Sequence, residues 1–149
     1  MTLPRFCRRG LLLAWLPALL MAPPARADIF LVVQAASPIK SLTQKEAVDL
    51  YTGRSRAFGN GEFALIFDLP RDSPQRAAFY QALTGMSPAQ INSYWSRLMF
   101  SGQTMPPQTL PNEQAMIAIV SRNPSALGYL SQEPNDKALR TVLVLKDPR

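Results

Sequence analysis

A group of hydroxyl, amide and guanidinium side chains stands where a predicted strand gives way to a predicted helix. The strand ends at Asp68, and Ser73-Pro74 is a helix start, because serine caps the first turn and proline fits the first helical position. A helix start exposes unpaired N–H groups and about half a positive charge. In an open α/β sheet, ligands collect beyond the carboxyl ends of the strands. We therefore predict an anion site that consists of Arg71, Asp72, Ser73, Gln75 and Arg76.

A purely structural role for these residues is the alternative. Ser73 then only caps the helix, and Arg71 and Arg76 are solvated. The local pattern by itself favours this second interpretation, so a further argument is needed to support binding.

Other side chains are weaker candidates for ligand contacts. Three aromatic residues could stack on a ligand: Tyr94, Trp95 and Tyr129. Positions 94 and 95 cannot both face the core, so one is partly exposed, and we expect Trp95 to be a core residue. Arg54 and Arg56 could meet a phosphate or a protein acid, but a solvated pair is expected. The irregular loop 103–111 contains a segment, 103–107, that could dock as a polyproline II helix, although a simple connection is favoured.

The residue types that are missing exclude several kinds of site. The sequence has no histidine, and its one cysteine is Cys7. Cys/His zinc sites, Ser-His-Asp triads and Cys-His dyads are therefore excluded after residue 27. The ten acidic residues are scattered, so an all-oxygen metal site is not expected either. We predict no catalytic residues, no metal and no cofactor.

The first 27 residues have the pattern of an export signal. Positive residues come first, and the apolar stretch Gly10–Met21 follows. Ala25-Arg26-Ala27 then matches a cleavage site. A membrane span needs about 20 apolar residues, so this stretch is too short for one. We expect removal of 1–27 and a periplasmic protein that is not embedded in the membrane. Sec export is expected rather than the twin-arginine route, because Cys7 stands before Arg8-Arg9 in place of serine or threonine.

The remaining chain, residues 28–149, has the size of one domain. Four of the 16 basic residues lie in the first 27 and none of the ten acidic ones does, so the net charge falls from +6 to +2. A charge this small does not support nucleic-acid binding.

Hydrophobic patterning predicts a series of strands and helices in this domain. Strands are expected at 29–33, 62–68, 126–130 and 141–145, and helices at 43–52, from 74 to 84, from 88 to 101, and a short one after Asn112. The order β-α-β-α-α-α-β-β predicts a single α/β domain with a central, mostly parallel sheet flanked by helices.

Three short motifs carry a resemblance to a known family. Glu46 to Gly53 reads E-A-V-D-L-Y-T-G, Ser73 to Phe79 reads S-P-Q-R-A-A-F, and Asn123 to Leu130 reads N-P-S-A-L-G-Y-L. In this order and spacing they resemble the second lobe of phosphate ABC transporter substrate-binding proteins, which belong to the type 2 periplasmic binding protein superfamily. The resemblance runs from about residue 40 to 130. It implies a binding protein fold and places an anion at Ser73.

The departures from this family bear on function. The family's loop has an arginine four residues before the serine, where this chain has Leu69, and Gly-Thr after the serine, where it has Pro74 and Gln75. Proline also removes one N–H. Family members are two-lobed, whereas this length suits one lobe, so an open face replaces a closed cleft. The resemblance therefore implies weak binding of phosphate or another oxyanion in an ABC transport or sensing system. The rival hypothesis is an interaction module that docks on a transporter, sensor kinase or envelope complex without a small ligand.

Overall fold

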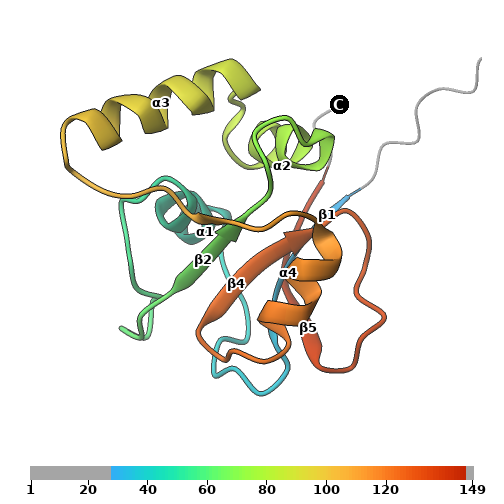
Figure 1. Cartoon of the computed structure of the whole chain (residues 1–149). Helices are drawn as coiled ribbons and strands as arrows, with labels where there is room; N and C mark the ends of the chain where they lie inside the picture. The colour runs from blue at the N-terminus through green and yellow to red at the C-terminus, as the bar shows by residue number, and fades with distance from the viewer. Residues whose placement is uncertain (1–27, 147–149) are drawn as a thin grey trace, which may run out of the picture.

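The structure is a computed structural model that describes residues 28–146, so the predicted signal segment lies outside the described residues. Five strands form one sheet in the order β3-β2-β4-β1-β5 (Figure 1). Their bounds are β1 Ile29–Gln34, β2 Leu65–Asp68, β3 Gln108–Thr109, β4 Ala126–Leu130 and β5 Leu139–Leu145. Strand β2 pairs in parallel with both β3 and β4, while β1 is antiparallel to β4 and to β5. Four strands thus share one direction and β1 opposes them, which confirms the predicted α/β class with a mostly parallel sheet.

Four helices connect and cover these strands: α1 Gln44–Tyr51, α2 Pro74–Thr84, α3 Pro88–Phe100 and α4 Glu113–Val120. Each helix begins after a capping residue whose side chain accepts a hydrogen bond from a backbone N–H in the first turn. The four capping residues are Thr43, Ser73, Ser87 and Asn112. Two of the caps, Thr43 and Ser87, are complete capping boxes. The predicted helix starts are therefore confirmed by the capping bonds themselves.

The helices divide between the two faces of the sheet, and strand β4 shows how. Successive side chains of a strand point to opposite faces. A side chain at Gly128 would meet Met116 and Val120 of α4, whereas the next residue, Tyr129, stacks on Phe79 of α2 with ring centroids 3.8 Å apart. Helices α4 and α2 therefore lie on opposite faces, and the absent side chain at Gly128 lets α4 approach closely.

Three boundaries differ from the predicted ones. Strand β2 begins at Leu65, three residues after the predicted start at Glu62, because Phe63 forms an isolated bridge with Ala57 in the preceding loop instead. Loop 103–111 is not wholly irregular, because Gln108–Thr109 forms β3 on the edge of the sheet. Both residues are exposed and the strand is only two residues long, so no alternation of apolar side chains marks it. Strand β5 begins at Leu139, two residues before the predicted start, because it continues to pair with the end of β1.

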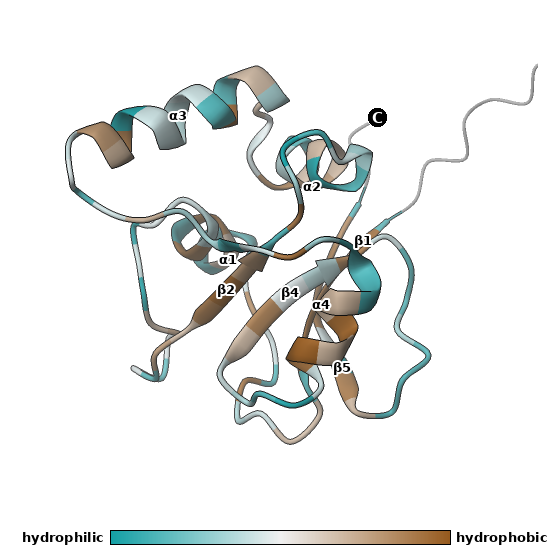
Figure 2. Ribbon diagram, in the orientation of Figure 1, coloured by the Kyte–Doolittle hydropathy of each residue, from teal (hydrophilic) through white to brown (hydrophobic). Residues whose placement is uncertain are grey.

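The core occupies both faces of the sheet and includes three tyrosines, Tyr51, Tyr80 and Tyr129. Figure 2 shows strand β2 as hydrophobic, while α3, at the upper edge of the molecule, carries hydrophilic and hydrophobic residues side by side. Within residues 28–146, no helix has the length and apolar character needed to cross a membrane.

Candidate functional site

Two strand–turn–helix units meet at the carboxyl end of β2 and β3. These strands are parallel neighbours, and each is followed within a few residues by a helix, α2 after β2 and α4 after β3. Because the two helices go to opposite faces, a crevice is expected between the turns. The structure has a groove of about 460 Å³ there, lined by residues from the segments 69–75 and 111–114. Both helix starts therefore open onto one groove.

Backbone N–H groups are the clearest binding feature of this crevice. At α2, Ser73 Oγ accepts the N–H of Arg76 at 3.3 Å, and proline supplies no N–H at position 74. At α4, Asn112 Oδ1 accepts the N–H of Ala115 at 2.9 Å. Of the amides in the two first turns, those of Gln75, Glu113 and Gln114 are left without a protein acceptor among residues 28–146. Three N–H groups are thus available to an anion.

A buried network around Asp68 fixes the geometry of the turn after β2. Its Oδ2 atom accepts from Arg76 Nε at 2.8 Å and from the Tyr80 hydroxyl at 3.1 Å. Its Oδ1 atom accepts from the Tyr129 hydroxyl at 2.7 Å and from the Leu69 N–H at 2.8 Å. Because Asp68 is only 4% exposed, every one of these bonds replaces solvation that burial removes.

The same network removes one predicted binding residue from the crevice surface. Arg76 is 5% exposed, its Nη1 atom donates to Asn92 Oδ1 at 3.0 Å, and its guanidinium lies over the Tyr80 ring, 4.9 Å from the centroid. The charge of Arg76 is therefore balanced by Asp68 inside the protein. The alternative hypothesis, in which Arg76 is a solvated surface residue, is therefore also wrong for Arg76.

Three phenols around this network are held in their neutral form. Burial, followed by the negative charge of Asp68, raises the pKa of Tyr51, Tyr80 and Tyr129 well above the usual value for tyrosine. The hydroxyls of Tyr80 and Tyr129 therefore act as hydrogen-bond donors to Asp68 rather than as acids.

The predicted residues are thus placed in three different ways. Asp72, Ser73 and Gln75 line the crevice, Arg71 is exposed in the turn beside it, and Arg76 is buried. Sequence reasoning missed the second wall, whose polar members are Asn112, Glu113 and Gln114. Asn112 was recognised as a helix cap, but its position opposite Ser73 depends on β3, which the sequence pattern did not reveal.

Charges in the crevice limit how tightly it can hold an anion. Asp72 and Glu113 are the charged residues of its lining. The Glu113 carboxylate accepts from the Ser131 N–H at 2.6 Å and from the Ser131 hydroxyl at 3.0 Å, which directs it into protein contacts. The Ser73 hydroxyl itself donates to Gln75 Oε1 at 2.9 Å. Any attraction for an anion would therefore come first from the N–H groups and the nearby Arg71 rather than from a paired arginine.

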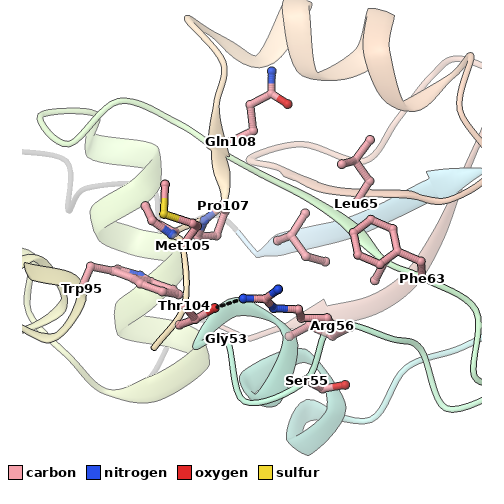
Figure 3. Close-up of a pocket in the computed structure, with 14 residues that line it drawn as sticks. Gly53, Ser55, Arg56, Phe63, Leu65, Trp95, Thr104, Met105, Pro107 and Gln108 are labelled. Atoms are coloured by element: carbon pink, nitrogen blue, oxygen red, sulfur yellow. Dashed lines mark hydrogen bonds between the residues drawn. The ribbon is translucent and has the colours of Figure 1, made fainter. Parts of the chain in front are cut away.

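A second groove, of about 270 Å³, lies beside the start of β2 (Figure 3). Phe63 lies on one side and Met105 and Pro107 on the other, while Arg56 donates to Thr104 Oγ1 at 3.2 Å. Of the other candidates, Trp95 is buried as expected and Tyr94 is half-buried. Among residues 28–146, no cluster of three His, Cys, Asp or Glu side chains could hold a metal ion.

Comparison with solved structures identifies the fold. A protein from Clostridium perfringens, described as a phosphate ABC transporter substrate-binding protein and solved with bound phosphate, matches 78% of this chain with a TM-score of 0.61 and 20% sequence identity. An ABC-type phosphate transport receptor from Vibrio cholerae matches 78% with a TM-score of 0.60 and 18% identity. These values confirm the resemblance at the level of fold.

The match covers 45% and 46% of those two proteins, so this chain spans less than half of their length. No model of a protein family matches the chain. No curated protein matches its sequence either. The evidence for the fold therefore comes from structural similarity and not from sequence similarity.

Proposed function

We propose that this protein binds phosphate or a related oxyanion weakly in the crevice between the starts of α2 and α4, as a periplasmic component of a phosphate-type ABC transport or sensing system. The observation that carries the proposal is that the adjacent parallel strands β2 and β3 lead into helices on opposite faces of the sheet, and that both helices begin at the same groove. The likeness to proteins described as phosphate transporter components supports the choice of ligand. The proposed ligand set is the amides of Gln75, Glu113 and Gln114, the Arg71 side chain, and the Ser73 hydroxyl, which would exchange its bond to Gln75 Oε1 for one to the anion.

Weak binding follows from the chemistry of this set. A charge-assisted hydrogen bond contributes about 1.5–3 kcal/mol, but Arg76 is committed to Asp68, and Asp72 lies on the crevice wall. An open groove also leaves much of the ligand in water, whereas a good pocket encloses about 70–90% of it. We expect a dissociation constant in the millimolar range for phosphate.

Isothermal calorimetry with phosphate, sulfate and arsenate tests this proposal. Ser73→Ala and Ser87→Ala form a matched pair, because both serines cap a helix whose first residue is proline. Each is expected to cost about 1 kcal/mol of stability, but only Ser73→Ala should weaken phosphate binding. The absence of heat with every oxyanion at millimolar concentration would remove the proposal.

A specific observation also favours a second role, docking on a protein of the cell envelope. Three large apolar side chains are strongly exposed: Phe100 at 99%, Met105 at 75% and Phe63 at 62%. Exposed aromatic and methionine side chains are enriched in protein interfaces. Co-purification of a membrane transporter or sensor after crosslinking in cells, lost in a Phe63→Ser, Met105→Ser variant, would support this role. Unchanged capture by that variant would argue against it.

A further inference from the structure

The edge of β2 that faces β3 is only partly paired. In the register of the sheet, Phe67 lies opposite Gln108, and Asp68 lies opposite Thr109. At the other end of the same edge, the Ala64 N–H donates to the Arg56 carbonyl at 2.9 Å. Two residues, Leu65 and Ile66, lie between these contacts, and the edge is incompletely paired along this stretch.

The free groups at this gap can be identified from the direction of the neighbouring bonds. The Leu65 N–H donates to the Ser125 carbonyl at 2.8 Å, so Leu65 directs its backbone groups toward β4. Backbone groups alternate in direction along a strand, so the Ala64 carbonyl and the Ile66 N–H point to the opposite edge. Neither has a bond to another group among residues 28–146. The gap therefore offers one acceptor and one donor.

The chain's own backbone cannot close this gap fully. Extending the register of β3 backwards places Pro107 opposite Ile66 and Pro106 opposite Leu65. In parallel pairing, the residue opposite Leu65 donates its N–H to Ala64 and accepts from Ile66. Pro106 has no N–H to donate. The missing N–H of Pro106 therefore limits β3 to Gln108 and Thr109 and leaves the Ala64 carbonyl without a donor from this strand.

The second groove opens at this gap, and its lining is mostly apolar. Leu65 and Ile66 lie on the strand side, Met105 and Pro106 on the loop side, and the indole of Trp95 contributes to the lining. The left-handed backbone of Gly53 brings the loop after α1 close, since a side chain there would meet both Thr104 and Trp95.

One cation belongs to this groove. Arg56 is exposed, and Figure 3 shows its guanidinium turned toward Thr104 at one end of the groove. Among the described residues, no carboxylate lies within 4.0 Å of Arg56. A negative group on an occupant would therefore find an unneutralised partner.

We propose that this groove binds an extended segment of a partner protein, with one apolar residue opposite Leu65 and a carboxylate beside Arg56. The segment's backbone N–H donates to the Ala64 carbonyl and its carbonyl accepts from the Ile66 N–H, which adds one residue to the edge of the sheet. The apolar side chain contacts Met105 and Trp95. This inference rests on the second proposed role and gives it a defined surface, separate from the oxyanion crevice.

Titration of the ¹⁵N-labelled protein, expressed from the full 149-residue sequence, tests this proposal by NMR. The probe is the blocked tripeptide acetyl-valyl-leucyl-aspartyl amide. Two matched probes carry N-methylleucine, which cannot donate, or asparagine, which has no charge. We expect a saturable shift of the Ile66 amide proton with the first probe. N-methylation should weaken binding by at least about threefold, as for a lost neutral hydrogen bond.

Arg56→Gln tests the charged contact on the protein side. Removing one exposed ion pair should weaken binding of the aspartyl probe by about two- to fivefold and leave binding of the asparagine probe unchanged. Equal binding of all three probes, or an Ile66 amide that does not shift at millimolar peptide, would overturn the proposal. A shift of Ile66 that depends on protein concentration without peptide would also overturn it, in favour of a second copy of this chain. Phosphate titration reports on the other site, so the two failures are distinguishable.

Discussion

The two ends of strand β2 differ in how completely their polar groups are satisfied. At the carboxyl end, the Asp68 carboxylate accepts four hydrogen bonds and the Asp68 carbonyl accepts the Leu110 N–H at 2.8 Å. At the amino end, Pro106 supplies no N–H to the strand edge, and the Ala64 carbonyl and the Ile66 N–H are unpaired.

This difference separates rigid support from available surface. At the carboxyl end, Asp68 and Arg76 neutralise each other inside the protein and hold the turn and the start of α2 in place. An anion at this end would therefore meet backbone amides. The amino end is apolar and has spare backbone groups, so it suits a polypeptide. One short strand therefore positions two surfaces of unlike chemistry.

The largest effect that separates the ends is expected at alkaline pH. The pKa values of Tyr51, Tyr80 and Tyr129 are higher in the folded protein than in the unfolded chain. Their contribution to stability is full below about pH 10, the unfolded value, and falls as the pH rises above it. Absorbance at 295 nm should show these three phenols ionising together with the loss of circular dichroism. Ionisation of these phenols while the protein is still folded would contradict the buried network that we describe at the carboxyl end of β2.

Breaking the ion pair at the carboxyl end should cost almost as much. Asp68→Ala leaves the buried Arg76 charge and two hydroxyls without their acceptor, so we expect a loss of about 3–5 kcal/mol in the free energy of unfolding by urea. The control is Asp49→Ala, which removes the half-buried partner of the exposed Lys45 and should cost less than about 1 kcal/mol. Similar losses for both variants would show that the Asp68 network is not the support we describe.

A substitution at Gly128 tests the close packing of α4 against β4, and its expected effect is smaller. In Gly128→Ala, the new methyl group would lie 2.5 Å from Met116 Sδ and 3.1 Å from Val120 Cγ2, which should destabilise by about 1–3 kcal/mol through overpacking. Gly59→Ala is the control, because its new methyl group meets only the end of the flexible Glu46 side chain. Thermal unfolding of both variants measures the difference, and equal midpoints would place α4 further from β4 than the structure has it.

The smallest expected effect concerns the open end. Pro106→Ala supplies the missing N–H and should let β3 extend along β2, with a net change in stability within about 1 kcal/mol. Hydrogen exchange should slow at the Ile66 amide, and the aspartyl tripeptide should bind more weakly. A wild-type Ile66 amide that already exchanges slowly would contradict an open edge.

Much of the fold followed from local rules that the structure confirms. Caps at Thr43, Ser73, Ser87 and Asn112 mark helix starts, because a side-chain acceptor three residues before a free N–H is a local requirement. Strand β3 did not follow, since its two exposed residues after Pro107 are strand only through pairing with β2. Without β3, the sequence also did not reveal that the start of α4 lies across the crevice from the start of α2.

The burial of Arg76 was beyond sequence reasoning for a different reason. A surface arginine and a paired, buried one look alike in a helix, and the choice depends on Asp68, eight residues earlier at the end of a strand. The open edge of β2 likewise depends on the register that places Pro106 opposite Leu65. Three-dimensional pairing, rather than composition, decides both features.

Amide shifts on addition of inorganic phosphate test the central claim most directly. The account predicts saturable movement of the Gln75, Glu113 and Gln114 amides in ¹⁵N spectra at millimolar phosphate, with the Gln90 amide at the start of α3 unmoved. Movement of a different set of amides, or of none, would contradict an oxyanion site between α2 and α4.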